Sequence, residues 1–300
     1  MPSLQSRFAR LITKQFLGRK FRKGRSIADW RDTMERLARY QKTLPGTDIQ
    51  TRSINGIPAE WVEAPGARTD CALLYLHGGA GVMGSPATHR ALVARLSAIT
   101  HIRALVLDYR LAPEHPFPAA LQDAVSAYGW LLDSGYAASR LVVGGDSAGG
   151  GLALQTLITL RDSGRSLPAA AFFLSPVTDW VRFDGESYAT RATVDPMNNP
   201  ETCKFTAALF VGDTDPGTPL LYPLGMDLAG LPPLCIHVGD DEILLSDSIR
   251  LAERARASNV AVELKVWPSM WHTFQMNAPV VPEARRSLEE IGQFVVKEIE

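Results

Sequence analysis

Short apolar stretches alternate with longer amphipathic stretches over most of this sequence, and this alternation restricts the chain to few folds. Beyond residue 45 the short stretches have the length and the β-branched content of strands. The predicted strands cover 49–53, 57–63, 71–77, 104–108, 141–145, 169–174, 233–239 and 260–267. The predicted helices lie near 85–100, 117–134, 147–163, 244–258 and 283–299. This order predicts an α/β fold with an eight-stranded, mostly parallel sheet that helices cover on both faces.

Two regions stand outside the alternation. Residues 1–45 have a helical pattern, with an apolar face formed by Trp30, Met34, Leu37 and Tyr40. The interval between residues 174 and 233 is far longer than one crossover between parallel strands needs. We expect both regions to leave the sheet layer and to form a lid.

The pentapeptide Gly145-Asp146-Ser147-Ala148-Gly149 has the form Gly-x-Ser-x-Gly and joins a predicted strand to a predicted helix. A serine on such a sharp turn projects its hydroxyl from the end of a sheet, and small neighbours let other backbone approach it. Glycine and serine are also common in ordinary turns. The pentapeptide therefore indicates a nucleophile only if suitable partners lie at the same edge of the sheet.

A serine nucleophile needs a base, and the base needs a carboxylate that orients it. Such groups collect at the carboxyl ends of the strands. Asp240, Asp241 and Glu242 follow the seventh predicted strand, and His272 follows the eighth. Of the six histidines, His272 alone follows the last strand. The order serine, acid, histidine is that of an α/β-hydrolase, but spacing leaves the acid open among the three carboxylates.

A glycine-rich loop after the third predicted strand offers backbone donors for the oxyanion that such a reaction forms. The loop reads His77-Gly78-Gly79-Ala80-Gly81, and glycines can present N–H groups with no side chain in the way. The amide that follows the nucleophile adds a further donor. The predicted oxyanion-hole residues are Gly78, Gly79, Ala80 and Ala148.

Composition excludes several other classes of protein. The net charge of −1 gives no bias toward nucleic acid. The three cysteines, Cys71, Cys203 and Cys235, are far apart and have neither metal-ligand spacing nor the pattern of a disulfide framework. We therefore expect no metal or organic cofactor and a reducing, cytoplasmic location. No apolar run has the length of a membrane span or the character of a signal peptide.

The N-terminus is strongly basic. Residues 1–28 contain eight Arg or Lys and no Asp or Glu, and Phe8, Leu11, Ile12 and Phe16 recur at helical spacing. The interpretation we favour is a helix that covers part of its own protein with the apolar face. The alternative is a helix that lies on an anionic membrane surface.

Residues from about 45 to 300 resemble the bacterial hormone-sensitive-lipase-like esterases, the family IV carboxylesterases of the α/β-hydrolase superfamily. The resemblance rests on five motifs, which are His77-Gly78-Gly79-Ala80, the run 108–118 (DYRLAPEHPFP), the pentapeptide 145–149, the run 241–245 (DEILL) and Trp271-His272. The second motif is long and specific.

The resemblance implies Ser147 as nucleophile, His272 as general acid and base, and Asp241 as the orienting acid, because the family's acid begins a pattern like DEIL. It implies oxyanion donors from Gly79, Ala80 and Ala148. It also implies a catalytic domain over 46–300 and a helical cap built from 1–45 and an insertion at 180–215. The family usually has a third glycine where this chain has Ala80, and a positive φ there would strain an alanine.

The expected activity is hydrolysis of short- to medium-chain acyl esters through a covalent acyl-enzyme, with a small ester as the partner and no cofactor. The same machinery also serves amidases, lactonases and deacetylases, and some relatives have become non-catalytic ligand-binding proteins. We expect Trp180, Phe205 and Phe210 to form the cap core rather than pocket walls. The outer edge of the eighth strand could pair two copies into a homodimer.

Overall fold

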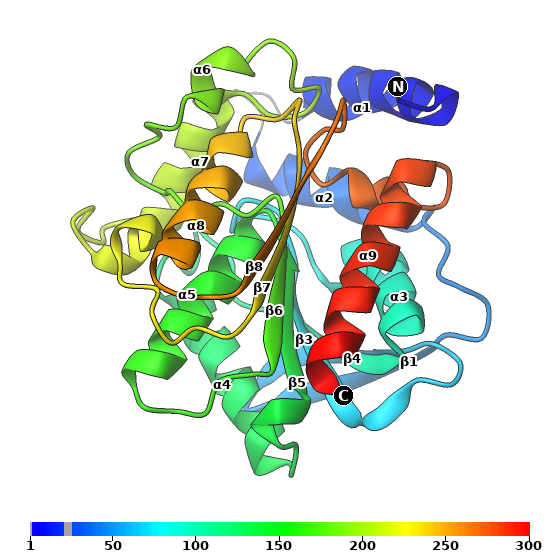
Figure 1. Ribbon diagram of the computed structural model, residues 1–300. Helices are drawn as coiled ribbons and strands as arrows, with labels where there is room; N and C mark the ends of the chain where they lie inside the picture. Colours follow the sequence, from blue (N-terminus) through cyan, green and yellow to red (C-terminus); the bar gives the residue numbers. More distant parts are fainter. Residues whose placement is uncertain (1, 21–25) are drawn as a thin grey trace.

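A computed structural model describes residues 2–20 and 26–300, and its eight-stranded sheet lies between two layers of helices (Figure 1). The strand order is β1-β2-β4-β3-β5-β6-β7-β8; β1 and β2 run antiparallel and the strands from β3 to β8 run parallel. The predicted α/β fold with a mostly parallel sheet is confirmed. The strands are β1 (Asp48–Ile54), β2 (Ile57–Glu63), β3 (Arg68–Leu76), β4 (Ile102–Leu107), β5 (Leu141–Asp146), β6 (Ala170–Leu174), β7 (Leu234–Gly239) and β8 (Val262–Trp267).

Five helices cover the two faces of this sheet, close to the predicted ranges. One layer contains α3 (Pro86–Thr100) and α9 (Pro282–Ile299). The other layer contains α4 (Ala119–Asp133), α5 (Ala148–Asp162) and α8 (Leu245–Ala257).

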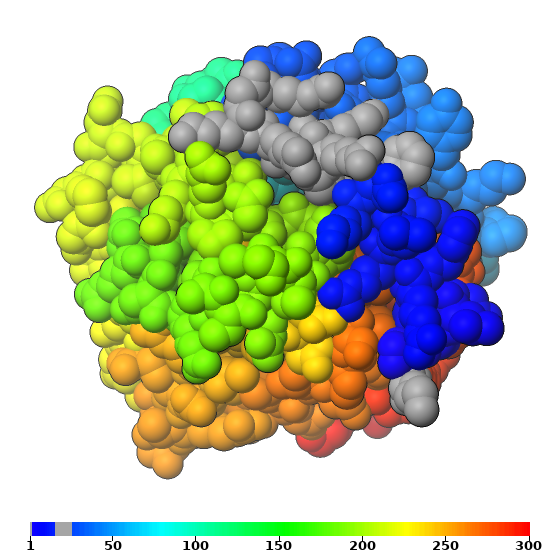
Figure 2. Space-filling model, turned by 90° about the horizontal axis from the view of Figure 1, so that it is seen from above, coloured from blue at the N-terminus to red at the C-terminus, as the bar shows by residue number. Residues whose placement is uncertain are grey.

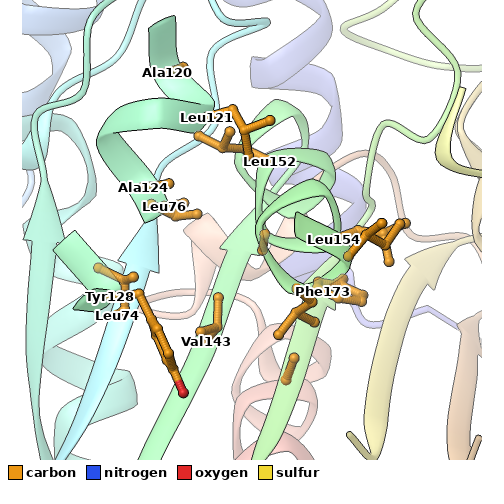
Figure 3. Packing of buried hydrophobic residues seen from close by; sticks show 14 of the residues in the cluster. Leu74, Leu76, Ala120, Leu121, Ala124, Tyr128, Val143, Leu152, Leu154 and Phe173 are labelled. Carbon is orange, nitrogen blue, oxygen red and sulfur yellow. The ribbon is translucent and has the colours of Figure 1, made fainter. Parts of the chain in front are cut away.

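The alternation of side chains along each strand separates the core into two parts. On β3, Leu74 and Leu76 pack with the α4 and α5 layer, whereas Leu73 and Tyr75 pack with the α3 and α9 layer. Figure 3 shows Leu74 and Leu76 beside labelled side chains of α4 and α5. Both faces of β3 are buried from Cys71 to Leu76, which explains why this part of the strand is a continuous apolar run.

Two segments lie over the edge of the sheet where the parallel strands end (Figure 1). The first contains α1 (Leu4–Lys20) and α2 (Ile27–Ala38), and the second is the interval between β6 and β7 with α6 (Ser187–Thr190) and α7 (Pro200–Val211). We call these two segments the cap. Residues 1 and 21–25 of the predicted cap lie outside the described residues.

Helix α1 does not bury the face that the sequence analysis favoured. Ser6, Ala9 and Thr13 are buried, whereas Phe8 and Leu11 are exposed. The side chain of Phe16 lies outside the described residues. The small residues face inward because α1 lies close against the rest of the cap and α9, so the favoured interpretation of this helix is wrong. No helix in the described ranges is both long and apolar enough to cross a bilayer.

Candidate active site

Ser147 occupies a strained turn between β5 and α5. Its backbone has φ 53 and ψ −123, a conformation that costs free energy for any residue with a side chain. The small flanking residues make this turn fit the sheet. A Cβ on Gly149 would overlap the carbonyl oxygens of Leu76 and His77, and a Cβ on Gly145 would overlap the backbone of Gly149. The predicted position of Ser147 at the end of a strand is therefore explained by local packing.

His272 lies in the loop after β8 and faces Ser147. The distance from His272 Nε2 to Ser147 Oγ is 2.9 Å, which lies within hydrogen-bond reach. The His272 side chain is buried. Burial lowers the pKa of His272, but Glu242, Asp195 and Asp146 together outweigh burial and leave the pKa above its ordinary value.

Glu242, and not Asp241, is the acid beside His272. Glu242 Oε1 lies 3.3 Å from His272 Nδ1, and Glu242 Oε2 accepts hydrogen bonds from Ser175 Oγ at 2.8 Å and from the Gly239 N–H at 3.1 Å. The carboxylate of Asp241 instead forms an ion pair with Arg10. The expectation that Asp241 orients His272 is thereby corrected.

The course of the chain after β7 explains this difference. The strand ends at Gly239, and the following turn directs successive side chains to different sides. Asp240 accepts a hydrogen bond from the Ser269 N–H at 2.5 Å and Asp241 faces α1, so Glu242 is the residue that turns back toward the strand ends. No local sequence signal separates Glu242 from Asp241, because both belong to the same run that follows β7.

The cap holds the turn that carries Glu242. Arg191 Nε donates to the carbonyl of Asp240 at 2.7 Å, and Asp195 Oδ2 accepts from the Ile243 N–H at 3.1 Å. Arg10 spans Asp241 and the carbonyl of Val194. Sequence analysis missed Asp195, because nothing in its local pattern relates it to the acid.

Asp195 is a buried carboxylate that interacts electrostatically with His272 and Glu242. Burial raises the pKa of Asp195 to about 6; His272 opposes this shift and Glu242 adds to it. Asp195 Oδ1 accepts from the N–H groups of Met197 and Asn198 at 2.8 and 2.9 Å. Asp195 is thus a second carboxylate whose charge acts on His272.

The predicted oxyanion donors differ in whether their N–H groups are free. The Gly78 N–H donates to Asp146 Oδ1 at 2.9 Å, so it is already used and the expectation for Gly78 is corrected. The N–H groups of Gly79, Ala80 and Ala148 have no hydrogen-bond partner among the described residues. These three amides remain the available donors near Ser147.

Ala80, which stands where the family usually has glycine, adopts the strained positive-φ conformation. Its φ is 56, in the left-handed region that favours glycine. Three buried hydrogen bonds support the segment that precedes Ala80. Asp146 accepts from Tyr75 Oη at 2.8 Å and from the Gly78 N–H, and Tyr109 Oη donates to the carbonyl of His77 at 2.6 Å.

The run 108–118 therefore supports the loop through Tyr109. The ring of Tyr109 stacks on His77 with the ring centroids 4.2 Å apart.

Asp146 also lies 3.4 Å from His89 Nε2 in a buried pair. Burial by itself would raise the pKa of the Asp146 carboxyl, but His89 and the hydrogen bond from Tyr75 outweigh burial and keep that pKa low.

A cavity of ≈ 230 Å³ opens between the cap and the strand ends. It contacts Ser147 and His272, and most of its other side chains are apolar. Trp180, expected in the cap core, lines the cavity and also stacks on Phe210 with centroids 4.0 Å apart. The other cavity residues include Thr13, Trp30, Met34, Leu37, Gly79, Ala80, Met83, Val177, Phe183, Tyr188, Met197, Cys203, Ala207, Leu244, Trp271 and Met276.

The polar residues of the described ranges form no cluster of three or more His, Cys, Asp or Glu that could hold a metal ion.

Known proteins are similar to this chain in sequence and in structure. Residues 73–276 match a family described as alpha/beta hydrolase fold. An acetyl-hydrolase of Streptomyces hygroscopicus is 41% identical over 84% of this chain and 83% of its own. An esterase of Acinetobacter venetianus is 34% identical over 88% of this chain and 87% of its own.

Solved structures are similar over the whole chain. The crystal structure of an esterase from the bacterial hormone-sensitive lipase family has a TM-score of 0.95 and 42% identity, and the match covers 100% of both chains. The crystal structure of EstE5 soaked with p-nitrophenyl butyrate has a TM-score of 0.93 and 40% identity, and the match covers 99% of both chains.

Proposed function

Because this chain belongs to the bacterial hormone-sensitive lipase family of α/β-hydrolase esterases, we propose that it hydrolyses carboxylic esters through Ser147, His272 and Glu242 and a covalent acyl-enzyme. One observation carries this proposal. His272 lies between Ser147 Oγ at 2.9 Å and Glu242 Oε1 at 3.3 Å, which is the arrangement that a serine nucleophile requires.

In the first half of the reaction, His272 Nε2 accepts the hydroxyl proton of Ser147 as Oγ attacks the ester carbonyl carbon. The N–H groups of Gly79, Ala80 and Ala148 hold the oxyanion, and each such donor typically contributes about 3 kcal/mol to the transition state. His272 then gives the proton to the departing alcohol. Water repeats the same steps on the acyl-enzyme and releases the acid.

Glu242 supports the charged form of His272. Its buried carboxylate faces Nδ1, so it orients the imidazole and stabilises the imidazolium that forms when Ser147 loses its proton. The hydrogen bonds from Ser175 and Gly239 hold the carboxylate in place. The raised pKa of His272 has the same origin.

The size and lining of the cavity support short- to medium-chain acyl esters as substrates. A volume of ≈ 230 Å³ accommodates a small ester, and the apolar lining from α2, α7 and the interval before α6 favours an acyl chain over a charged group. Crystals of the similar protein EstE5 were soaked with p-nitrophenyl butyrate, an ester with a short acyl chain. We propose that the cap, residues 1–45 and 180–215, sets the upper limit on chain length above the domain formed by 46–300.

The test combines a variant with a substrate series. Ser147→Ala should abolish hydrolysis of p-nitrophenyl butyrate. The wild-type protein, trapped as its acyl-enzyme, should gain the mass of one acyl group, and the Ser147→Ala variant should not. Wild-type activity on p-nitrophenyl esters from acetate to palmitate should peak at the short or medium chains. Faster hydrolysis of a matched amide or lactone than of the ester would contradict the proposed substrate class.

A further inference from the structure

Helix α1 exposes to solvent the face that an amphipathic helix normally buries. Leu4, Phe8, Leu11 and Ile12 are 78%, 65%, 54% and 42% exposed and share one side of the helix. The opposite side, with small or polar residues, faces the protein. Isolated exposed apolar residues are ordinary, but a row of four on one helix needs a physical reason.

The apolar surface extends beyond α1. Val194 is exposed, and its carbonyl accepts from Arg10 of α1 at 2.7 Å. Val280 is also exposed and lies three residues before Glu283, which accepts from Ser3. Among the described residues, only Tyr40 and Ile49 are large exposed hydrophobics elsewhere. We call Leu4, Phe8, Leu11, Ile12, Val194 and Val280 the α1 patch; Figure 2 views α1 and the neighbouring insertion from this side.

Basic residues accompany the α1 patch. Arg7 and Lys14 are exposed on the same helix, and neither has an ion-pair partner in the part of the chain that the structure describes. Helix α1 contains no acidic residue, whereas the whole chain has a net charge of −1. The basic charge is thus concentrated on the segment that carries the exposed apolar row.

Most of the α1 patch lies on a helix whose other side lines the active-site cavity. Thr13, on the buried side of α1, lines the same cavity as Ser147. A surface that contacts α1 would therefore lie next to the cavity. An amphiphilic ester held in such a surface would have a short path to the nucleophile.

We propose that the α1 patch docks the protein on an anionic lipid bilayer. Phe8, Leu11 and their apolar neighbours enter the boundary between headgroups and acyl chains, and Arg7 and Lys14 pair with the anionic headgroups. A second copy of the chain fits less well, because a two-fold contact through this patch would bring two basic helices together. An anionic bilayer complements the charge and the apolar row at the same time.

The experiment is co-sedimentation of the full chain with vesicles of phosphatidylcholine alone or mixed with phosphatidylglycerol. The wild type should bind the mixed vesicles at least about tenfold more tightly than the neutral ones, and added salt should weaken the binding. Phe8→Ser with Leu11→Ser, and separately Arg7→Gln with Lys14→Gln, should each reduce binding roughly tenfold or more. The matched control, Tyr40→Ser with Ile49→Ser, removes exposed apolar side chains outside the α1 patch and should bind like the wild type.

All four proteins should hydrolyse a soluble short-chain ester at the wild-type rate, which shows that they are folded. Equal vesicle binding by the wild type and the Phe8/Leu11 variant would overturn the proposal, as would no binding to either vesicle. A concentration-dependent dimer that the Phe8/Leu11 variant abolishes, without vesicle binding, would assign the α1 patch to a second copy instead. Binding is measured without substrate, so its failure is distinct from a failure of the proposed ester hydrolysis.

Discussion

Asp195 Oδ2 accepts a hydrogen bond from the N–H of Ile243 at 3.1 Å, and this contact ties the cap to the residue that directly follows Glu242. The same carboxylate is buried and raises the pKa of His272 by its charge. Asp195 is therefore a positioning residue that holds the acid turn and also supports the protonated imidazole.

We expect Asp195→Asn to lower kcat on p-nitrophenyl butyrate by roughly tenfold with little change in KM. The amide would place a donor opposite the Ile243 N–H, and losing one such hydrogen bond costs about 1 kcal/mol. Asp195, Glu242 and Asp146 each favour the charged form of His272. Without the charge of Asp195 the pKa of His272 falls, so the acid limb of the pH–rate profile should move to lower pH. Asp195→Glu should restore part of the shift, and the exposed Asp213→Asn should change neither quantity. An unchanged acid limb in Asp195→Asn would contradict the electrostatic role.

Glu242→Gln and Asp241→Asn separate the two candidate acids. Gln keeps the shape of Glu242 but removes the charge that faces Nδ1, and comparable losses at serine triads lower kcat by about 10³- to 10⁴-fold. Asp241 pairs with Arg10 at the surface, and such pairs contribute at most about 1 kcal/mol, so Asp241→Asn should cost less than about fivefold. Steady-state kinetics on one ester decides between them, and the opposite ranking would restore Asp241 as the acid.

Ala80→Gly should stabilise the protein. An L-residue in the left-handed region costs about 1–2 kcal/mol, and Ala80→Gly removes this strain. Glycine also gives the unfolded chain more freedom, which offsets about 0.5–1 kcal/mol of the gain in stability. The net increase in the free energy of unfolding should be roughly 0.5–1 kcal/mol by urea denaturation. Ala137→Gly, at φ −68, provides the control and should destabilise. A loss of stability in Ala80→Gly would mean that the Ala80 methyl packs more favourably than its backbone strain costs.

Asp247→Asn should increase stability at pH 8 and leave it nearly unchanged at pH 5. Burial raises the pKa of Asp247 from its ordinary value of 3.8 to about 7, with Thr178 opposing the shift and Asp179 adding to it. The folded state thus holds its proton more tightly than the unfolded state, so stability falls as the pH rises from about 4 to about 7. The neutral amide avoids this loss, and we expect a gain of about 1–3 kcal/mol at pH 8. Thermal unfolding at both pH values measures it; an equal gain at both would indicate a packing effect instead.

Much of the fold was predictable because strand and helix periods are local properties of the chain. The strands, the helices that cover them and the turn at Ser147 each depend on a few consecutive residues. His272 was predictable as well, because it alone among six histidines follows the last strand.

The errors arose where a contact joins distant segments. Three consecutive carboxylates follow β7, and contacts with distant residues distinguish them: Asp240 with Ser269, Asp241 with Arg10 and Glu242 with Ser175. The use of the Gly78 N–H depends on Asp146, which belongs to another strand. Helix α1 buries its small residues and exposes its apolar row because of the segments it packs against, and the helical periodicity of its sequence carries no information about those segments.

The contacts of α1 also determine when the active site can be completed during synthesis. Ser3 binds Glu283, 280 residues further along the chain, and Arg10 binds Asp241, 231 residues further along. These two contacts of α1 can therefore form only after residues 241 and 283 have been made, long after α1 itself. Because Thr13 of α1 lines the cavity, the wall that α1 contributes is secured late in synthesis.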